Sequence, residues 1–552
     1  MPAVEPLIFL VIGVVAVNGI AGRIGVPAPI LLLVAGVGVS FIPGVPEVQV
    51  EPEVVLTVLI PPLLFAAATE ASVVALRGLL RSITQLAVGM VLVTAFAVAA
   101  VAYLLIPGIP FAAALALGAI VAPPDAVAAI AVARRAGLPR RVVTVLEGES
   151  LFNDATSLVL LRVALVGLAV GTMSWGEAVL EFAWATAGGI LVGGVVGVVL
   201  SWARRHTGST LATTALSLVA PFVADQLGEA AQASGILAVV VAGLVLGYRA
   251  PYDLKPQVRL TLTATWSTVQ YVLEGTVFAL IGLQLWAIVT APDIGRRPVV
   301  LISGAILLTV ILIRPVWIFL LNWTGRLLRR PGSFDDWRPL AAVSWAGMRG
   351  VVSLAAAQTL PLDTPYRSLL LTCTIAVILG TLVVQGLTLP TAIKWLHFPG
   401  DPAAEIDAER MAARDEANRA IAAAVEREIA ENDVPADRAR RMRLWVETRD
   451  WRTLAEDPRS ASDTGRSRLH RLADWNRDMM NIERDVFVGL RNSGRISEEV
   501  MREIEYGLDL EEALLDQRLD VATGHLDQLR STRDDPADDP PGSPPDRATG
   551  PA

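Results

Sequence analysis

Two aspartates stand inside long apolar stretches of this chain, where a charge is costly and usually lines an ion path. Asp125 directly follows Pro123 and Pro124, and two consecutive prolines remove backbone donors and break a helix. The break exposes carbonyl oxygens beside a carboxylate, and oxygen-rich sites of this kind suit hard monovalent cations. A kinked helix in which Asp125 only caps the second half is the simpler alternative.

The second aspartate, Asp154, belongs to a polar face of a predicted helix. Ser150 precedes it by four residues and Asn153 follows Ser150 by three, so hydroxyl, amide and carboxylate share one face. These groups can replace the water around a cation. Because one carboxylate holds a proton or a cation but not both, Asp154 could exchange the two. The alternative is a polar cluster that only joins helices.

A buried arginine occupies a second interrupted stretch. Gly347 and Gly350 flank Arg349 and weaken a helix there. A guanidinium at membrane depth requires an anion. Glu149 is one candidate, because it lies on the helix of Asp154 but faces away from the polar side. A substrate anion is the other, and it would reverse the sign of the cargo.

Composition excludes an ordinary soluble enzyme. The chain of 552 residues is 53% apolar and 18% charged, with a mean hydropathy of +0.53. Residues 1–400 carry 23 basic and 19 acidic side chains, whereas residues 401–552 carry 23 and 35. One cysteine and four scattered histidines give no disulfide framework and no local zinc site. From the charge counts, residues 1–400 are expected in a membrane and residues 401–552 in water.

Residues 1–400 form the predicted transmembrane domain. They contain thirteen apolar stretches able to cross a bilayer, each of roughly 20 residues. The stretches are 5–22, 26–43, 54–72, 83–106, 111–133, 142–171, 177–202, 210–227, 234–249, 268–290, 298–323, 338–359 and 367–391. The predicted fold is an all-α polytopic membrane protein of about thirteen helices.

Loop charges predict the orientation. Alternate loops hold seventeen Lys and Arg residues against three in the other set. Because basic residues gather on the cytoplasmic side, we expect a cell-membrane protein with its N-terminus outside and its tail inside.

The tail, residues 401–552, has a different character. The sequence predicts a cytosolic, mainly helical domain for residues 401–530. Residues 531–552 have few apolar side chains to bury, which predicts disorder. The tail has no nucleotide-binding glycine loop. We expect no cofactor and no nucleic-acid partner.

The two interrupted stretches are related by topology. The proline break lies in the fifth predicted span and the glycine break in the twelfth, and this odd offset makes the two run in opposite directions. Paired interruptions in inverted halves are typical of a midplane site in a secondary transporter. Letter-by-letter identity between the halves is not evident.

Four strings carry a family resemblance over residues 5–395. They are Ala122-Pro-Pro-Asp-Ala-Val, Glu149-Ser-Leu-Phe-Asn-Asp-Ala-Thr-Ser, Ser234-Gly-Ile-Leu-Ala and Gly347-Met-Arg-Gly-Val-Val. In order and spacing they resemble the monovalent cation/proton antiporters that include bacterial NhaP proteins and animal sodium/proton exchangers. The resemblance implies a homodimer with a six-helix core that moves like an elevator, and no enzymatic activity.

The resemblance also implies roles for individual residues. Asp154 would carry Na⁺ and a proton in turn, helped by Ser150 and the carbonyl of Pro124. Asp125 and Asn153 would stabilise the crossing of the broken helices. A buried ion pair would join Glu149 to Arg349. An asparagine before the aspartate is typical of the electroneutral branch of the family.

Two further acids have supporting or gating roles in the expected site. Glu70 lies one turn beyond the position where relatives often place an acid, so it is a possible gate or a helix-end surface charge. Glu274 matches a family acid and is expected to support the site. Where many relatives have threonine before the first aspartate, this chain has Pro124. Cation selectivity could differ accordingly.

The sequence thus predicts exchange of cytosolic Na⁺ for external protons. K⁺/H⁺ exchange on the same fold is the first alternative, and Li⁺ is a further candidate cation. The second alternative is an anion or solute carrier centred on Arg349, although the clustered acids would repel an anionic cargo. An intramembrane aspartyl protease using Asp125 and Asp154 lacks the motifs that such enzymes carry.

Overall fold

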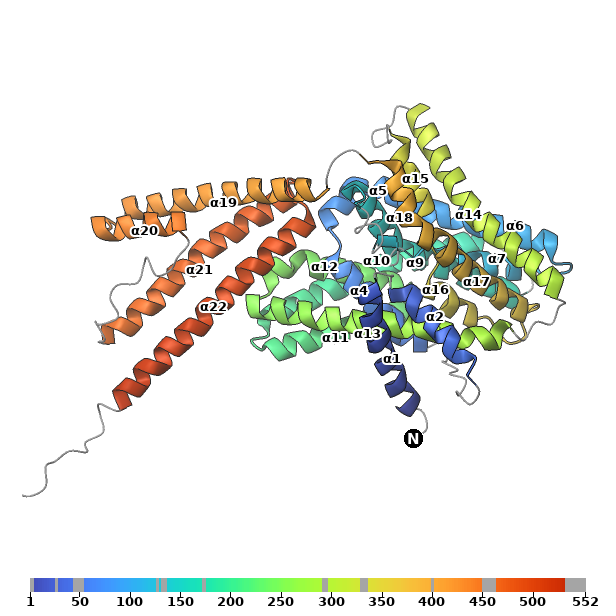
Figure 1. Cartoon of the computed structure of the whole chain (residues 1–552), viewed down its shortest axis with the longest axis horizontal. Coiled ribbons are helices and arrows are strands. Elements are labelled where there is room, and N and C mark those ends of the chain that lie inside the picture. The colour runs from blue at the N-terminus through green and yellow to red at the C-terminus, as the bar shows by residue number, and fades with distance from the viewer. Residues whose placement is uncertain are drawn as a thin grey trace, which may run out of the picture. The chain divides into compact units, whose positions relative to one another are not determined.

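The computed structural model describes residues 4–24, 28–42, 54–125, 129–130, 137–170, 175–289, 296–327, 336–398, 402–448 and 463–531. In these ranges the regular structure is entirely helical, which confirms the predicted fold class. The chain divides into two compact units, residues 1–408 and 409–552, so the division falls inside a helix (Figure 1). Residues 532–552, where we predicted disorder, lie outside the described ranges.

The first unit contains the predicted spans. Its helices are α1 (Val4–Ile24), α2 (Ala28–Ser40), η1 (Val55–Leu59), α4 (Ile60–Glu70), α5 (Val73–Thr84), η2 (Gln85–Met90), α6 (Val91–Leu105), α7 (Phe111–Val121), α9 (Arg140–Val170), α10 (Trp175–His206), α11 (Thr210–Ala230), α12 (Gly235–Asp253), α13 (Pro256–Val289), α14 (Arg296–Leu327), α15 (Trp337–Trp345), α16 (Val351–Gln358), α17 (Arg367–Thr381), η3 (Leu382–Gly386) and α18 (Leu387–Leu396). Every one of the thirteen predicted stretches overlaps one or more of these helices.

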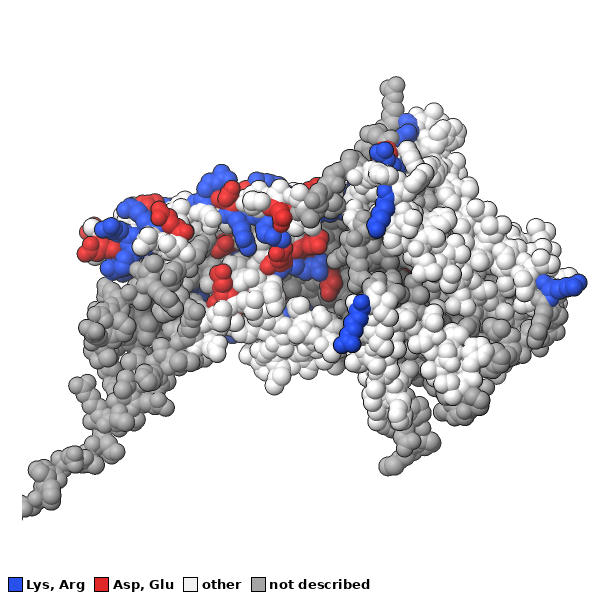
Figure 2. All heavy atoms as spheres, in the orientation of Figure 1, with Lys and Arg blue, Asp and Glu red and all other residues white. Residues whose placement is uncertain are grey.

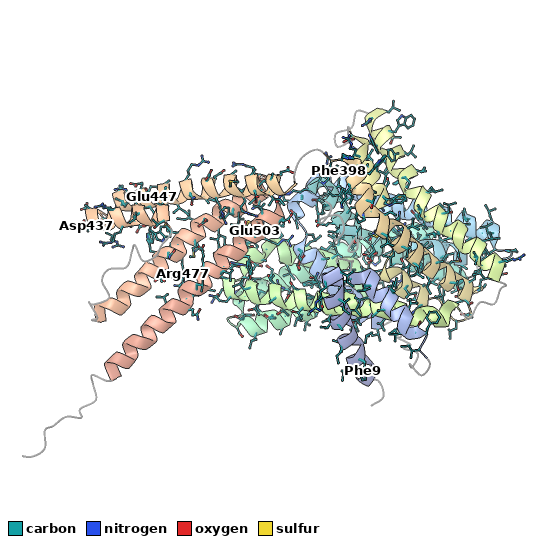
Figure 3. The ribbon with its side chains drawn as sticks, in the orientation of Figure 1. Phe9, Phe398, Asp437, Glu447, Arg477 and Glu503 are labelled. Atoms are coloured by element: carbon teal, nitrogen blue, oxygen red, sulfur yellow. The ribbon has the colours of Figure 1, made fainter. Side chains whose placement is uncertain are left out.

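Length and composition suit these helices to a membrane. In the described ranges, seven helices are long and apolar enough to cross a bilayer, and shorter apolar helices accompany them. Figure 2 shows a largely uncharged face over this unit. Apolar side chains such as Phe9 of α1 project from the surface (Figure 3). The number thirteen for the crossing helices remains a prediction.

Helix α7 lies at the centre of the first unit. Nearly all of its side chains are buried, and half of the buried residues are alanine. Small side chains let neighbouring backbones approach closely, and Gly118 of α7 touches the carbonyl of Ala95 on α6. Helices α6, α9, α16 and α17 pack around α7. The central position holds the end of α7, and the proline break after it, in the interior.

The second unit contains most of α19 (Pro402–Glu431), together with α20 (Ala436–Thr448), α21 (Asp463–Asn492) and α22 (Glu498–Ser531). Adjacent helices form antiparallel pairs, α19 with α20 and α21 with α22 (Figure 1). Trp445 and Trp475 meet edge to face at 4.8 Å in its core. Salt bridges on the outside include that of Arg410 with Glu503, and Figure 3 labels Glu503. The helical tail predicted from the sequence is confirmed for the described ranges.

Candidate cation-binding site

The two interrupted stretches meet in the interior of the first unit. Helix α7 ends at Val121, and the non-helical residues after it reach Asp125, whose backbone N–H donates to the carbonyl of Met348 at 2.7 Å. In return, Arg349 donates through Nη1 to the carbonyl of Ala122. Each break thus satisfies backbone groups of the other, as a buried helix end requires.

Helix α9 brings the predicted polar face to this crossing. The Nδ2 of Asn153 donates to the carbonyl of Pro124 at 2.7 Å, and both residues are buried. One turn later, Ser157 donates to the carbonyl of Ala119 at 2.8 Å. Two hydrogen bonds therefore fix α9 against the end of α7. Ser150, at the start of the polar face, is partly buried.

Asp154 lies at the centre of a group of charges. Its side chain is 7% exposed, and the charged groups that act on it are Asp125 and Arg349. Glu274, partly buried on α13, interacts electrostatically with Asp125 and with Glu70 at the end of α4. Three of the predicted acids, Asp125, Asp154 and Glu274, therefore lie near enough to interact at the first break, and Glu70 is a neighbour of Glu274. Their combined negative charge, offset by one arginine, favours a cation.

The buried ion pair differs from the prediction. Both oxygens of Glu149 accept from Arg314 of α14, at 2.5 and 2.7 Å, and each side chain is 1% exposed. The Nε of Arg314 also donates to the carbonyl of Val343 at 3.0 Å. The expectation that Arg349 is the hydrogen-bonded partner of Glu149 is wrong, because the Arg349 guanidinium turns toward the carbonyl of Ala122.

Comparison with known proteins identifies the chain's relatives. The family model of the transmembrane sodium/hydrogen exchangers matches residues 7–395. The chain belongs to the sodium/hydrogen exchanger family. An uncharacterized Na⁺/H⁺ exchanger of Mycobacterium bovis is 33% identical over 524 residues, covering 92% of this chain and 95% of that protein. The Na⁺/H⁺ antiporter ApNhaP of Aphanothece halophytica is 30% identical over 68% of this chain and 71% of its own.

A solved structure shares the fold of this exchanger-family chain. The sodium proton antiporter MjNhaP1 of Methanocaldococcus jannaschii aligns with a TM-score of 0.58 at 20% identity, over 72% of this chain and 100% of that one. The resemblance predicted from the four sequence strings is therefore confirmed. The family is one of transporters and not of enzymes, as the sequence predicted.

The sequence did not predict one hydrogen bond at the crossing of the two breaks. The backbone N–H of Arg349 donates to the Oγ1 of Thr381 at 3.0 Å, and this hydroxyl donates to the carbonyl of Val377. Thr381 ends α17, where the π-helix η3 begins, and π-helical turns often occur at functional sites. In the sequence Thr381 is only one polar residue in an apolar run, so nothing there signalled its role.

We expect Gly350→Ala to impair transport strongly, because no room exists for a Cβ at the crossing. A Cβ at this position would overlap the carboxylate of Asp125. The breaks would have to separate, and the hydrogen bond from Asp125 to Met348 would be lost. Gly304→Ala on α14, where a Cβ meets no atom within 4 Å, is the matched control. Proton exchange in liposomes should fall for the first variant and stay near wild type for the second. Equal activity of both variants would contradict a tight crossing.

Proposed function

We propose that this chain is an electroneutral Na⁺/H⁺ antiporter that exchanges cytosolic Na⁺ for external protons by alternating access, without ATP. The observation that carries the proposal is the placement of Asp154 beside two crossed helix breaks, with Asp125 and Arg349 as its charged neighbours. The names of the relatives, which specify Na⁺/H⁺ exchange, support the choice of ions. We further propose a homodimer in the cell membrane, with the N-terminus outside and the tail inside.

Coupling follows from competition at one carboxylate. Na⁺ at Asp154 would be balanced by the negative charge and coordinated by Ser150 and the carbonyl of Pro124. A proton on the same carboxylate removes that charge and expels the cation. If only an occupied, neutralised site crosses the membrane, each Na⁺ moved in one direction is matched by one proton in the other.

The polar neighbours of Asp154 would tune this competition. Asn153 donates a hydrogen bond to one lone pair of the Pro124 carbonyl oxygen and so holds this carbonyl in place. The second lone pair of the same oxygen is available for a ligand. Asp125 and Glu274 add negative potential without bonding the cation in this scheme. Glu70, which is exposed at the end of α4, would attract cations toward the site as a gate.

The competition predicts a pH-dependent affinity. Lowering the pH protonates Asp154, so the KM for Na⁺ should rise with proton concentration while the maximal rate at saturating Na⁺ changes little. The rise approaches about tenfold per pH unit where the protonated form dominates, because one proton displaces one cation. Initial rates in liposomes at several Na⁺ concentrations and pH values measure this. A KM independent of pH would contradict a shared site.

The function itself is tested with purified full-length protein in acid-loaded liposomes that contain a pH dye. Adding Na⁺ should alkalinise the interior, and clamping the membrane potential with valinomycin and K⁺ should leave the rate unchanged. Replacing Na⁺ by Li⁺ or K⁺ ranks the cations, and a faster response to K⁺ would favour the K⁺/H⁺ alternative. Failure of every cation to move protons through folded protein would overturn the proposal and favour an anionic cargo held by Arg349.

A further inference from the structure

A second polar cluster lies apart from the transport site, where the C-terminal ends of α10 and α12 meet the N-terminal ends of α11 and α13. Five basic residues occur in these helix ends: Arg204, Arg205, Arg249, Lys255 and Arg259. The sequence stretches 198–217 and 246–266, which supply them, contain one acid, Asp253. The cluster is therefore strongly positive, and it accounts for much of the basic excess of residues 1–400.

Hydrogen bonds join the cluster into one unit. Arg205 contacts Asp253 at 2.5 Å, and the same carboxylate accepts from Ser201. Arg249 of α12 donates to the hydroxyl of Ser201 on α10 at 3.2 Å. The single carboxylate is thus already occupied by Arg205 and Ser201, although five basic residues occur in these helix ends.

Arg204 is the member whose surroundings point to a missing anion. Its side chain is 6% exposed, and its Nη2 donates to the hydroxyl of Ser217 at 2.9 Å, which also accepts from Trp266. Its Nε has no hydrogen-bond partner among the described residues. Asp253 is near enough to interact with the charge of Arg204, but its oxygens are bonded to Arg205 and Ser201. The buried guanidinium of Arg204 therefore has an unmet donor and a neutral hydroxyl as its direct contact, which is costly. An anion placed between the helix ends would satisfy the donor and the charge together.

We propose that these helix ends bind a phosphate-bearing anion, namely the headgroup phosphate of an anionic lipid. Guanidinium groups match phosphate in charge and geometry, and basic pockets between transmembrane helices bind lipid headgroups. The N-terminal ends of α11 and α13 add partial positive charge from their free N–H groups. Trp202 and Tyr252 are exposed at the same helix ends. Such aromatic residues lie at the level of lipid headgroups, which favours a lipid over a soluble phosphate.

Binding is tested on the full-length protein in neutral detergent by native mass spectrometry and by thermal unfolding. Phosphatidylglycerol is added to one sample, phosphatidylcholine to a second and inorganic phosphate to a third. We expect phosphatidylglycerol to bind and to raise the unfolding temperature more than phosphatidylcholine does. In Arg204→Gln the affinity for phosphatidylglycerol should fall about tenfold, as expected for the loss of one charge-assisted contact. Arg249→Gln, at a partly exposed position, should lower the affinity in the same direction and serves if Arg204→Gln fails to fold.

The matched control is Arg81→Gln, which removes an exposed arginine of α5 and should bind phosphatidylglycerol like the wild type. Stabilisation by millimolar inorganic phosphate that depends on Arg204, without an effect of phosphatidylglycerol, would keep the anion site but assign it to a soluble phosphate. Equal binding of phosphatidylglycerol and phosphatidylcholine, or equal loss in Arg81→Gln and the two cluster variants, would overturn the proposal.

Discussion

Asp154→Asn is expected to abolish cation-driven proton movement and to leave the folded protein intact. Asparagine keeps the volume of the side chain, so the packing of α9 against α7 should survive. The amide can neither release a proton nor balance the charge of a cation in a buried site. Loss of a few kcal/mol of cation binding corresponds to a decrease of more than about a hundredfold in transport at moderate Na⁺. Dye-loaded liposomes measure the rate, and gel filtration verifies the fold.

The matched control for this substitution is Asp225→Asn. Asp225 of α11 is also buried, at 6% exposure, but its charged neighbour is Glu229 and not the residues of the crossing. Exchange by this variant should stay within about twofold of the wild type, the size of effect expected for a buried group outside the site. Transport by Asp154→Asn at the wild-type rate would remove this residue from the proposed mechanism. Equal loss of transport in both variants, each folded by gel filtration, would mean that the effect is not specific to the crossing.

The chemistry of the site could be predicted because it is encoded locally. Ser150, Asn153 and Asp154 lie within five residues, and helical periodicity alone places them on one face. The two prolines before Asp125 fix the break without knowledge of any neighbour. Only the meeting of the two breaks is non-local, and the inverted order of the spans indicated it. The structure adds the hydrogen bond from Asp125 to Met348, which no pattern in the sequence specifies.

The partner of Glu149 could not be predicted by the same reasoning. Two arginines, Arg314 and Arg349, stand in apolar stretches, and each needs an anion. Sequence periodicity gives the face of a helix but not which distant helix packs on it. Glu149 and Arg314 are 165 residues apart, and α14 is continuous, so no break drew attention to it. Two buried guanidinium groups have two different partners here, a carboxylate for Arg314 and the backbone carbonyl of Ala122 for Arg349.

The number of helices that cross a membrane is also beyond the sequence. Every predicted stretch overlaps a helix, but α5 lies almost wholly between two of them. The twelfth stretch proved to be two short helices, α15 of 9 residues and α16 of 8 residues, separated by non-helical backbone. The pair Gly347 and Gly350 predicts that the helix is interrupted, but it does not predict the length of the non-helical segment. Segments of 10 to 17 apolar residues fit both a spanning helix and a buried core helix. Length and composition therefore identify the membrane fold more securely than they count its spans.

The buried pair predicts a large loss of stability when one partner is neutralised. In Glu149→Gln the guanidinium of Arg314 would stay buried without its carboxylate. Removing one member of a buried ion pair typically costs about 3–5 kcal/mol of unfolding free energy. Equilibrium unfolding in mixed micelles measures this loss. Arg162→Gln is the surface control, since Arg162 faces Glu181 at 3.6 Å with both side chains over a third exposed. Its loss should stay below about 1 kcal/mol.

A second substitution identifies which arginine depends on Glu149. Adding Arg314→Met to Glu149→Gln removes the unpaired charge and should recover most of the lost stability, because a buried pair can often be replaced by apolar side chains of similar volume. Adding Arg349→Met should give much less recovery, since that guanidinium donates to the carbonyl of Ala122 and interacts with the Glu149 charge without a hydrogen bond to it. Recovery with Arg349→Met but not with Arg314→Met would contradict the pairing. It would instead make the second break, and not α14, the counterpart of the Glu149 carboxylate.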